Sequence, residues 1–259
     1  MKKLITALMT LTLTASLFAL DGREIIQKAL DVKDPAFTQS AVQMDLIEKN
    51  GAKETRMVRE YGRSKNDLKA VVMVFMSPAS VKDTRFLLQE NKGSTPDDKF
   101  IYLPDLRSTR RVSTAEGSKS FMGTDASYDD LSTRDIDVDT HELLKEENKN
   151  GYNCYAVKST AKNPADSQYG YRIQWIDKET WVPVYAELYD KKGALLKVLT
   201  VEKLEKVTGA TGAEYNIPMV NNMKNVQTGH QTRITIQKII LDKAIPDRVF
   251  TQVFLNTGK

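Results

Sequence analysis

The chain has 259 residues, of which 41% are hydrophobic, and its 38 basic and 34 acidic side chains give a net charge of +4. These charges are spread through the sequence, which excludes the concentrated basic patch of a nucleic-acid-binding protein. The single cysteine, Cys154, excludes an intrachain disulfide. Because it lies among strand-forming residues, we interpret it as a small buried hydrophobe.

The first 20 residues are predicted to be a secretory signal peptide. Two lysines precede an apolar run that extends to residue 20, small residues lie near its end, and charged residues follow at once. This run is short for a membrane anchor, since a spanning helix needs about 20 apolar residues. We expect cleavage near Ala19 or Leu20, export to the periplasm and only peripheral contact with a membrane. The mature chain would then carry a charge of +2.

The remaining residues, 21–259, are predicted to form one domain of mainly β structure with a few short helices. Residues 22–30 have apolar side chains at helical spacing, and Gly51, Gly151 and Gly193 mark tight hairpin turns. Alternating apolar residues predict strands over 42–46, 57–61, 71–75, 85–89, 100–103, 142–147, 152–159, 169–176, 181–189, 195–205 and 232–241. So few helices cannot cover both faces of so large a sheet, so we expect a single, strongly curved antiparallel sheet.

The segment between Pro104 and Leu131 is unlike an ordinary loop. Most connections are a few residues long, whereas this one is long, rich in Gly, Ser and Thr, and carries Phe121, Met122 and Tyr128. We interpret it as a lid or plug that packs against an apolar surface.

Arg107, Arg110 and Arg111 lie at the start of this segment. They can bind a phosphate or carboxylate headgroup through charge-assisted hydrogen bonds, or they can pair with neighbouring acids and hold the lid in place. We favour the second interpretation because arginine is well suited to such pairs and several acids are near in sequence. These acids are Asp105, Asp125, Asp129 and Asp130.

No catalytic residue, cofactor or metal site is predicted. His141 and His230 are the only histidines, neither lies in a nucleophile motif, and we expect both to face solvent. Asp135, Asp137 and Asp139, followed by Glu146, match several ligand positions of a calcium-binding loop. The glycine of its sharp turn is missing, however, so we interpret the run as a solvated acidic strand edge.

Three stretches, YLPDLRSTRRV, SFMGTDASYDDL and WVPVYAELYDKKGALLK, carry a resemblance to a known family. They resemble the LolA-like periplasmic proteins of outer-membrane lipoprotein sorting, in the branch that accompanies RND-type exporters. The resemblance covers nearly the whole chain. It implies an unclosed β-barrel whose helices and loop form a lid over a hydrophobic cavity. The implied cavity or lid residues are Tyr102, Phe121, Met122, Tyr128 and Trp175.

The expected function is that of a non-enzymatic carrier. It would bind the acyl chains of lipoproteins or lipids and pass them toward the outer membrane or a transporter partner. Burying each methylene stabilises the complex by about 0.8 kcal/mol, so release is the harder step, and a lid that fills the empty cavity would ease it. The alternative is an accessory or sensor protein that docks on an RND-type exporter or another envelope complex. That protein would have a small or polar cavity and an exposed apolar patch elsewhere.

Overall fold

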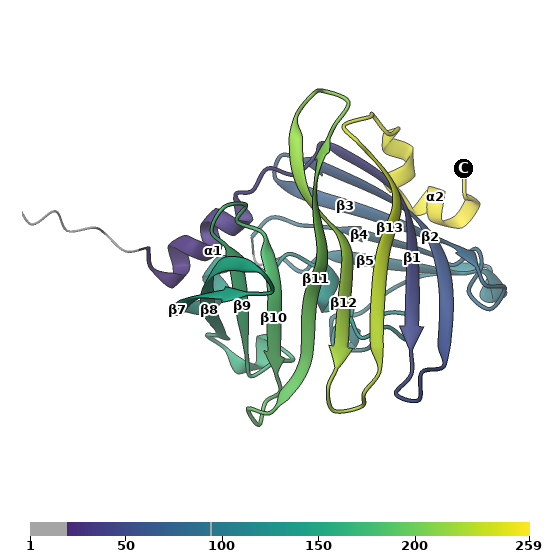
Figure 1. Ribbon diagram of the computed structural model, residues 1–259. Coiled ribbons are helices and arrows are strands. Elements are labelled where there is room, and N and C mark those ends of the chain that lie inside the picture. The colour runs from purple at the N-terminus through teal and green to yellow at the C-terminus, as the bar shows by residue number, and fades with distance from the viewer. Residues whose placement is uncertain (1–19, 94) are drawn as a thin grey trace, which may run out of the picture.

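The computed structural model describes residues 20–93 and 95–259. The predicted signal peptide therefore lies outside the described residues, except for Leu20. Thirteen strands form one antiparallel sheet that curves strongly without closing (Figure 1). This confirms the predicted fold class. The elements are α1 (Gly22–Leu30), β1 (Phe37–Ile47), β2 (Lys53–Lys65), β3 (Leu68–Ser77), β4 (Arg85–Gln89), β5 (Asp98–Leu103), β6 (Ser108–Arg111), β7 (Asp139–Lys149), β8 (Tyr152–Ala161), β9 (Tyr171–Asp177), β10 (Pro183–Tyr189), β11 (Leu195–Thr208), β12 (Glu214–Asn225), β13 (Gln231–Leu241) and α2 (Gln252–Thr257).

The sheet consists of two wings that meet where β1 pairs with β13. The first wing runs outward from β1 to β6 in sequence order, and the second runs from β7 at the opposite edge back to β13. After β6 the chain must therefore travel from one edge of the sheet to the other. Residues 112–138 make this connection, and we call them the crossing segment. Its unusual length follows from this topology.

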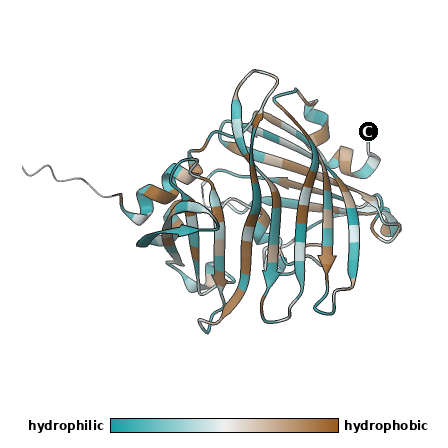
Figure 2. Ribbon diagram, in the orientation of Figure 1, coloured by the Kyte–Doolittle hydropathy of each residue, from teal (hydrophilic) through white to brown (hydrophobic). Residues whose placement is uncertain are grey.

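The predicted helix and hairpins are present. The helix occupies 22–30, and Asp21 caps it by accepting a hydrogen bond from the backbone N–H of Glu24. The three predicted turn glycines lie between β1 and β2, β7 and β8, and β10 and β11, each with a positive φ. Hydrophilic and hydrophobic residues alternate along the strands (Figure 2), as expected for a sheet with two different faces.

The sequence patterns did not predict β6, β12 or α2. β12 contains Pro218 and several asparagines, residue types that are depleted in strands. It forms because it pairs with β11 along nearly its whole length, and register shifts around Lys203 lie next to the position where Pro218 pairs with Leu204. A proline, which has no N–H to donate, is tolerated beside such an irregularity.

The two faces of the sheet are covered differently. On the convex face of the first wing, the C-terminal residues pack on β3 and β4 and bury Phe250, Leu255 and Val72. On the concave face, α1 covers β7 and β8 with Ile25 and Ile26, so the two helices lie at opposite ends of the sheet (Figure 1). Within the described ranges, no helix combines the length and the apolar character needed to cross a membrane.

Candidate ligand-binding hollow

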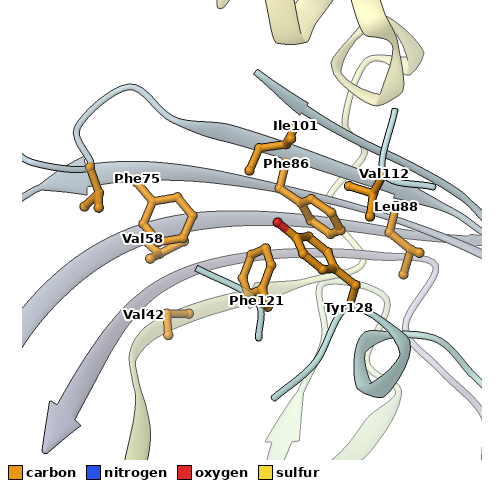
Figure 3. Close-up of a cluster of buried hydrophobic side chains, with 10 residues drawn as sticks. Val42, Val58, Phe75, Phe86, Leu88, Ile101, Val112, Phe121 and Tyr128 are labelled. Carbon is orange, nitrogen blue, oxygen red and sulfur yellow. The ribbon is translucent and has the colours of Figure 1, made fainter. Parts of the chain in front are cut away.

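The crossing segment packs aromatic side chains against the concave face of the first wing. Phe121 is 1% exposed and Tyr128 is 6% exposed. The Phe121 ring centroid lies 4.9 Å from that of Phe86, 6.2 Å from that of Phe75 and 5.6 Å from that of Tyr128. Figure 3 shows the two crossing-segment rings directed into side chains of β3, β4 and neighbouring strands. We call this group of buried side chains the plug cluster. Its members are Val42, Val58, Phe75, Val81, Phe86, Leu88, Ile101, Val112, Phe121 and Tyr128.

The backbone beside Phe121 turns sharply and is held by the sheet. Met122 and Gly123 both have positive φ values, +51° and +79°, and Met122 packs against the edge of the plug cluster. Its carbonyl oxygen accepts a hydrogen bond from the Arg56 guanidinium of β2. A non-glycine residue in this conformation is disfavoured and persists only where its surroundings impose it, so the turn that carries the plug residues is fixed from outside.

A buried polar contact attaches the crossing segment to the second wing. The Asp130 carboxylate accepts hydrogen bonds from the Tyr169 hydroxyl at 2.9 Å and from the Lys197 ammonium at 3.2 Å, and Lys197 also donates to the Tyr169 oxygen at 2.9 Å. The Lys197 and Asp130 side chains are 10% and 13% exposed. Burial, and after it the Asp130 charge, raises the pKa of Tyr169, so this hydroxyl remains a donor.

A second polar contact attaches the segment near the centre of the sheet. Asp125 accepts hydrogen bonds from the Thr232 hydroxyl and from the His230 ring nitrogen Nδ1, both at 2.8 Å, while its own N–H donates to Thr232 at 2.9 Å. Thr232 and Asp125 are both buried. The crossing segment is thus held on the first wing by apolar packing, with the Arg56 hydrogen bond and an ion pair between Lys99 and Asp129 beside it, and on the second wing by directional polar contacts.

The arginines at the start of the segment have other partners than those expected. Arg110 pairs with Glu116 and Arg111 pairs with Asp98, while Arg107 is exposed. Pairing with acids is therefore what the structure shows for two of them. The four expected acids are not their partners: Asp125 and Asp130 bind the residues described above, Asp129 pairs with Lys99, and Asp105 is exposed.

These contacts could not be found from nearby sequence. Lys197 lies 67 positions after Asp130, and Thr232 lies 107 positions after Asp125. One signal was available: Lys197 shares a strand face with Leu199, and a lysine on an apolar face is a reason to look for a buried partner.

An apolar void lies beneath the plug residues, between the two wings. Its volume is about 100 Å³. Its walls come from both wings and from the crossing segment, and include Met44, Met73, Phe121, Leu131, Leu199, Met223 and Ile234. A larger, open hollow of about 2770 Å³ has a mixed polar and apolar lining. Leu199 and Met223 line both spaces, so the void opens toward the hollow along β11 and β12.

Two residues that were expected to line the cavity, Tyr102 and Trp175, lie on the convex face of the sheet, so their assignment to the cavity is corrected. Tyr102 packs on the convex side, where the Arg85 guanidinium lies 4.7 Å from its ring. Trp175 is also convex: its Nε1 donates to Glu147 at 2.7 Å, and Lys149 lies 4.5 Å from its ring. Their strand neighbours Ile101 and Gln174 point to the concave side instead. Alternation separates two faces without indicating which is concave.

The histidines and the acidic run also differ from expectation. Both histidines are partly buried and hydrogen-bonded: His141 Nε2 lies 2.9 Å from the Ile136 carbonyl oxygen and Nδ1 lies 2.8 Å from the Ser159 hydroxyl. Asp139 is 4% exposed and binds Arg134 and Arg172, so this end of the acidic run is an internal ion-pair network. Among the described residues, no group of three or more metal-binding side chains is present.

Comparison with known proteins points to one fold and one family. A family model described as that of an uncharacterized protein matches residues 67–257. A domain from Vibrio parahaemolyticus, provisionally named an outer membrane lipoprotein-sorting protein, is 27% identical with a TM-score of 0.83, covering 91% of this chain and 98% of its own. A DUF1329 family protein from Desulfovibrio piger is 27% identical with a TM-score of 0.83, covering 90% of this chain and 97% of its own.

A more distant structure has the same fold. A LolA superfamily protein from Nitrosomonas europaea is 18% identical with a TM-score of 0.68, covering 91% of this chain and all of its own, 100%. No curated protein matches the sequence.

Proposed function

This chain belongs to the LolA-like family of outer-membrane lipoprotein-sorting proteins, and we propose that it is an exported periplasmic carrier of acyl chains. In this proposal residues 21–259 form the carrier domain. The concave face holds the chain of a lipid or lipoprotein, and the crossing segment takes its place when the carrier is empty. The cargo passes to the outer membrane or to a transporter partner.

The observation that carries this proposal is the way the concave apolar surface is covered. It is closed by one loop segment whose side chains come from outside the sheet, with an apolar void directly beneath Phe121. The void of about 100 Å³ is well below the roughly 300 Å³ at which ordinary ligand pockets begin. An acyl chain can therefore enter this apolar void, as distinct from the open hollow of mixed lining beside it, only if plug side chains withdraw.

Withdrawal of the plug makes binding reversible. An incoming chain buries methylenes at about 0.8 kcal/mol each, while Phe121 and Tyr128 lose their contacts with the first wing. The two changes oppose each other. The net binding free energy is therefore the difference between what the buried ligand methylenes contribute and what the displaced plug side chains lose. A carrier needs this property because it must give up its cargo as well as take it.

Hydrogen exchange tests this proposal directly. Adding oleate should speed amide exchange over residues 112–131, because the chain displaces the plug, and should leave α2 on the convex face unchanged. A protein that only docks on an exporter or envelope complex would bind no oleate and show no change in either region. Native mass spectrometry of protein purified from its own envelope, followed by lipid extraction, would then identify the cargo.

A further inference from the structure

We infer that Lys197, Tyr169 and Gln168 form a subsite for the acidic headgroup of the cargo, and that Asp130 occupies this subsite as a substitute anion while the carrier is closed. The inference rests on the proposed carrier function and adds the chemical class of its ligand. That class is an amphiphile with an anionic oxygen group, either a carboxylate or a phosphate.

The position of the subsite follows from the strand register. Arg172 of β9, Leu188 of β10 and Lys197 of β11 are consecutive cross-strand partners. Lys197 and Leu199 are two residues apart and therefore share a face, and Leu199 lines the apolar void. A chain lying in the void thus brings its head to Lys197.

Donors from the second wing converge on one carboxylate. The Asp130 carboxylate accepts hydrogen bonds from the Lys197 ammonium at 3.2 Å and from the Gln168 amide at 3.4 Å. The Tyr169 hydroxyl lies 2.9 Å and 3.0 Å from its two oxygens. A further donor, the Ser127 backbone N–H at 2.8 Å, belongs to the crossing segment and leaves with it, whereas the other three stay on the second wing. A ligand carboxylate placed where Asp130 lies would find the same partners, and charge-assisted hydrogen bonds of this kind are the strong ones.

The charges of the region require an anion there. Three cations, Arg134, Arg172 and Lys197, face two carboxylates, and Asp139 already binds both arginines. When the crossing segment withdraws, Asp130 and Arg134 leave with it, so Arg172 and Lys197 of the second wing face Asp139 alone and the positive charges exceed the negative by one. The Lys197 side chain is only 10% exposed, and a buried charge left without its partner is strongly unfavourable. A neutral ligand leaves that charge unpaired, whereas an acidic one restores the pairing.

This exchange of one anion for another also permits release. The electrostatic interaction lost with Asp130 is similar to the one gained with the ligand, so the subsite selects an acidic cargo without holding it permanently. When the headgroup departs, Asp130 can return to the same donors.

The test compares three ligands with the same oleoyl chain: oleate, oleoyl lysophosphatidate and neutral methyl oleate. Each displaces a neutral hydrophobic dye, N-phenylnaphthylamine, from the full-length mature protein. The wild type should bind both acidic ligands at least about tenfold more tightly than methyl oleate, the factor expected for one hydrogen-bonded charge. The tighter of the two acidic ligands identifies the headgroup as carboxylate or phosphate.

Two substitutions act on the subsite in opposite directions. Lys197→Met should remove the preference for acidic ligands, because methyl oleate then no longer leaves a buried charge unpaired, while Lys197→Arg should retain the preference. Asp130→Asn removes the substitute anion and should raise oleate affinity severalfold. Asp129→Asn is the matched control, since its neighbouring ion pair with Lys99 is 55% exposed at the carboxylate, and it should leave oleate affinity unchanged.

The outcomes separate the two proposals. If the wild type binds all three ligands equally and Lys197→Met changes nothing, the subsite is wrong and the carrier function stands. If none of the three ligands binds, the carrier function fails and the subsite with it. If Lys197→Met does not fold, Asp130→Asn decides: unchanged oleate affinity overturns the subsite, and increased affinity supports it.

Discussion

The two wings of the sheet hold the crossing segment by different physical means. The first wing receives Phe121 and Tyr128 in a group of apolar side chains, and the second receives Asp130 through a buried lysine and a tyrosine hydroxyl. Apolar burial is strong and non-directional, whereas a buried ion pair contributes little net stability and fixes geometry. Apolar packing on the first wing therefore stabilises the closed segment, and the buried polar contacts of the second wing, together with the Arg56 hydrogen bond, determine where it closes.

This difference suits a surface that must open and close in one register. A segment held by apolar contacts alone could settle in several positions, since other hydrophobic side chains of similar size fill a core with little loss. A segment held by polar contacts alone would lack the stabilisation needed to keep the hollow closed. The combination gives a plug that leaves when a better apolar group arrives and returns to one position.

The largest effect is expected at the first wing. Phe121→Ala should lower the free energy of unfolding by about 3–5 kcal/mol, the range for truncating a buried phenylalanine, and should raise the affinity for fatty acids because the void beneath the ring becomes larger. Chemical denaturation measures the first change and displacement of a neutral dye measures the second.

A matched substitution on the opposite face is the control for this prediction. Phe250 is 2% exposed beneath the C-terminal residues on the convex side. Phe250→Ala should therefore cause a comparable loss of stability with unchanged fatty-acid binding. If both variants changed binding equally, the effect would come from general destabilisation, and Phe121 would have no special relation to the hollow.

The second-largest effect is expected where the crossing segment meets the second wing. There the ion pair between Asp130 and Lys197 can be broken by one substitution or replaced by two. Asp130→Leu alone should cost on the order of 2 kcal/mol, because it leaves Lys197 buried without a partner while a small part of that side chain still reaches water. The double variant Asp130→Leu with Lys197→Met should recover most of this loss, since an apolar pair often equals a buried ion pair in stability. Denaturation of the wild type, the two single variants and the double variant forms a double-mutant cycle. Additive effects of the two substitutions would show that the pair is not coupled.

The sequence predicted those parts of the molecule that depend on local pattern. The hairpin glycines, the alternating strands and the helix over 22–30 follow from spacing and turn chemistry. The plug composition was also local, because Phe121 and Tyr128 lie within a few residues of each other in a segment otherwise rich in small residues. Topology supplies what the sequence did not, namely the reason that this segment must run from one edge of the sheet to the other.

The remaining features depend on long-range geometry. Tyr102 and Trp175 were assigned to the cavity, yet they lie on the convex face, because a period of two does not reveal the direction in which the sheet curves. Thr232, a partner of Asp125, and Lys197, the ion-pair partner of Asp130, lie on strands more than 60 positions later, and Tyr169 lies 39 positions after Asp130. Nearness in sequence favoured the arginines instead, and these pair with Glu116 and Asp98.

A smaller effect is expected from substituting Arg110 or Arg111. It measures how much the exposed ion pairs at the edge of the first wing contribute to the free energy of unfolding. Arg110 and Arg111 are 46% and 60% exposed in their pairs. Exposed pairs contribute about 0–1 kcal/mol, so Arg110→Ala and Arg111→Ala should each change the unfolding free energy by less than about 1 kcal/mol. Hydrogen exchange over residues 118–131 should stay close to that of the wild type. Markedly faster exchange there would mean that the edge pairs, rather than the buried contacts, hold the plug.

The smallest effect is a pH response confined to the start of the crossing segment. Hydrogen bonds from the Ser113 backbone N–H and then from its hydroxyl lower the pKa of Glu116 from 4.5 to about 2. Because the folded-state pKa is below the unfolded one, this interaction is fully present above about pH 4.5 and is lost as the pH falls toward 2. Amide exchange over residues 113–117, corrected for its intrinsic pH dependence, should therefore lose protection on acidification before the plug cluster does. Glu116→Gln, which keeps a hydrogen-bonding side chain without the titrating charge, should remove this pH dependence. If Glu116→Gln kept it, the response would have to come from a group other than Glu116.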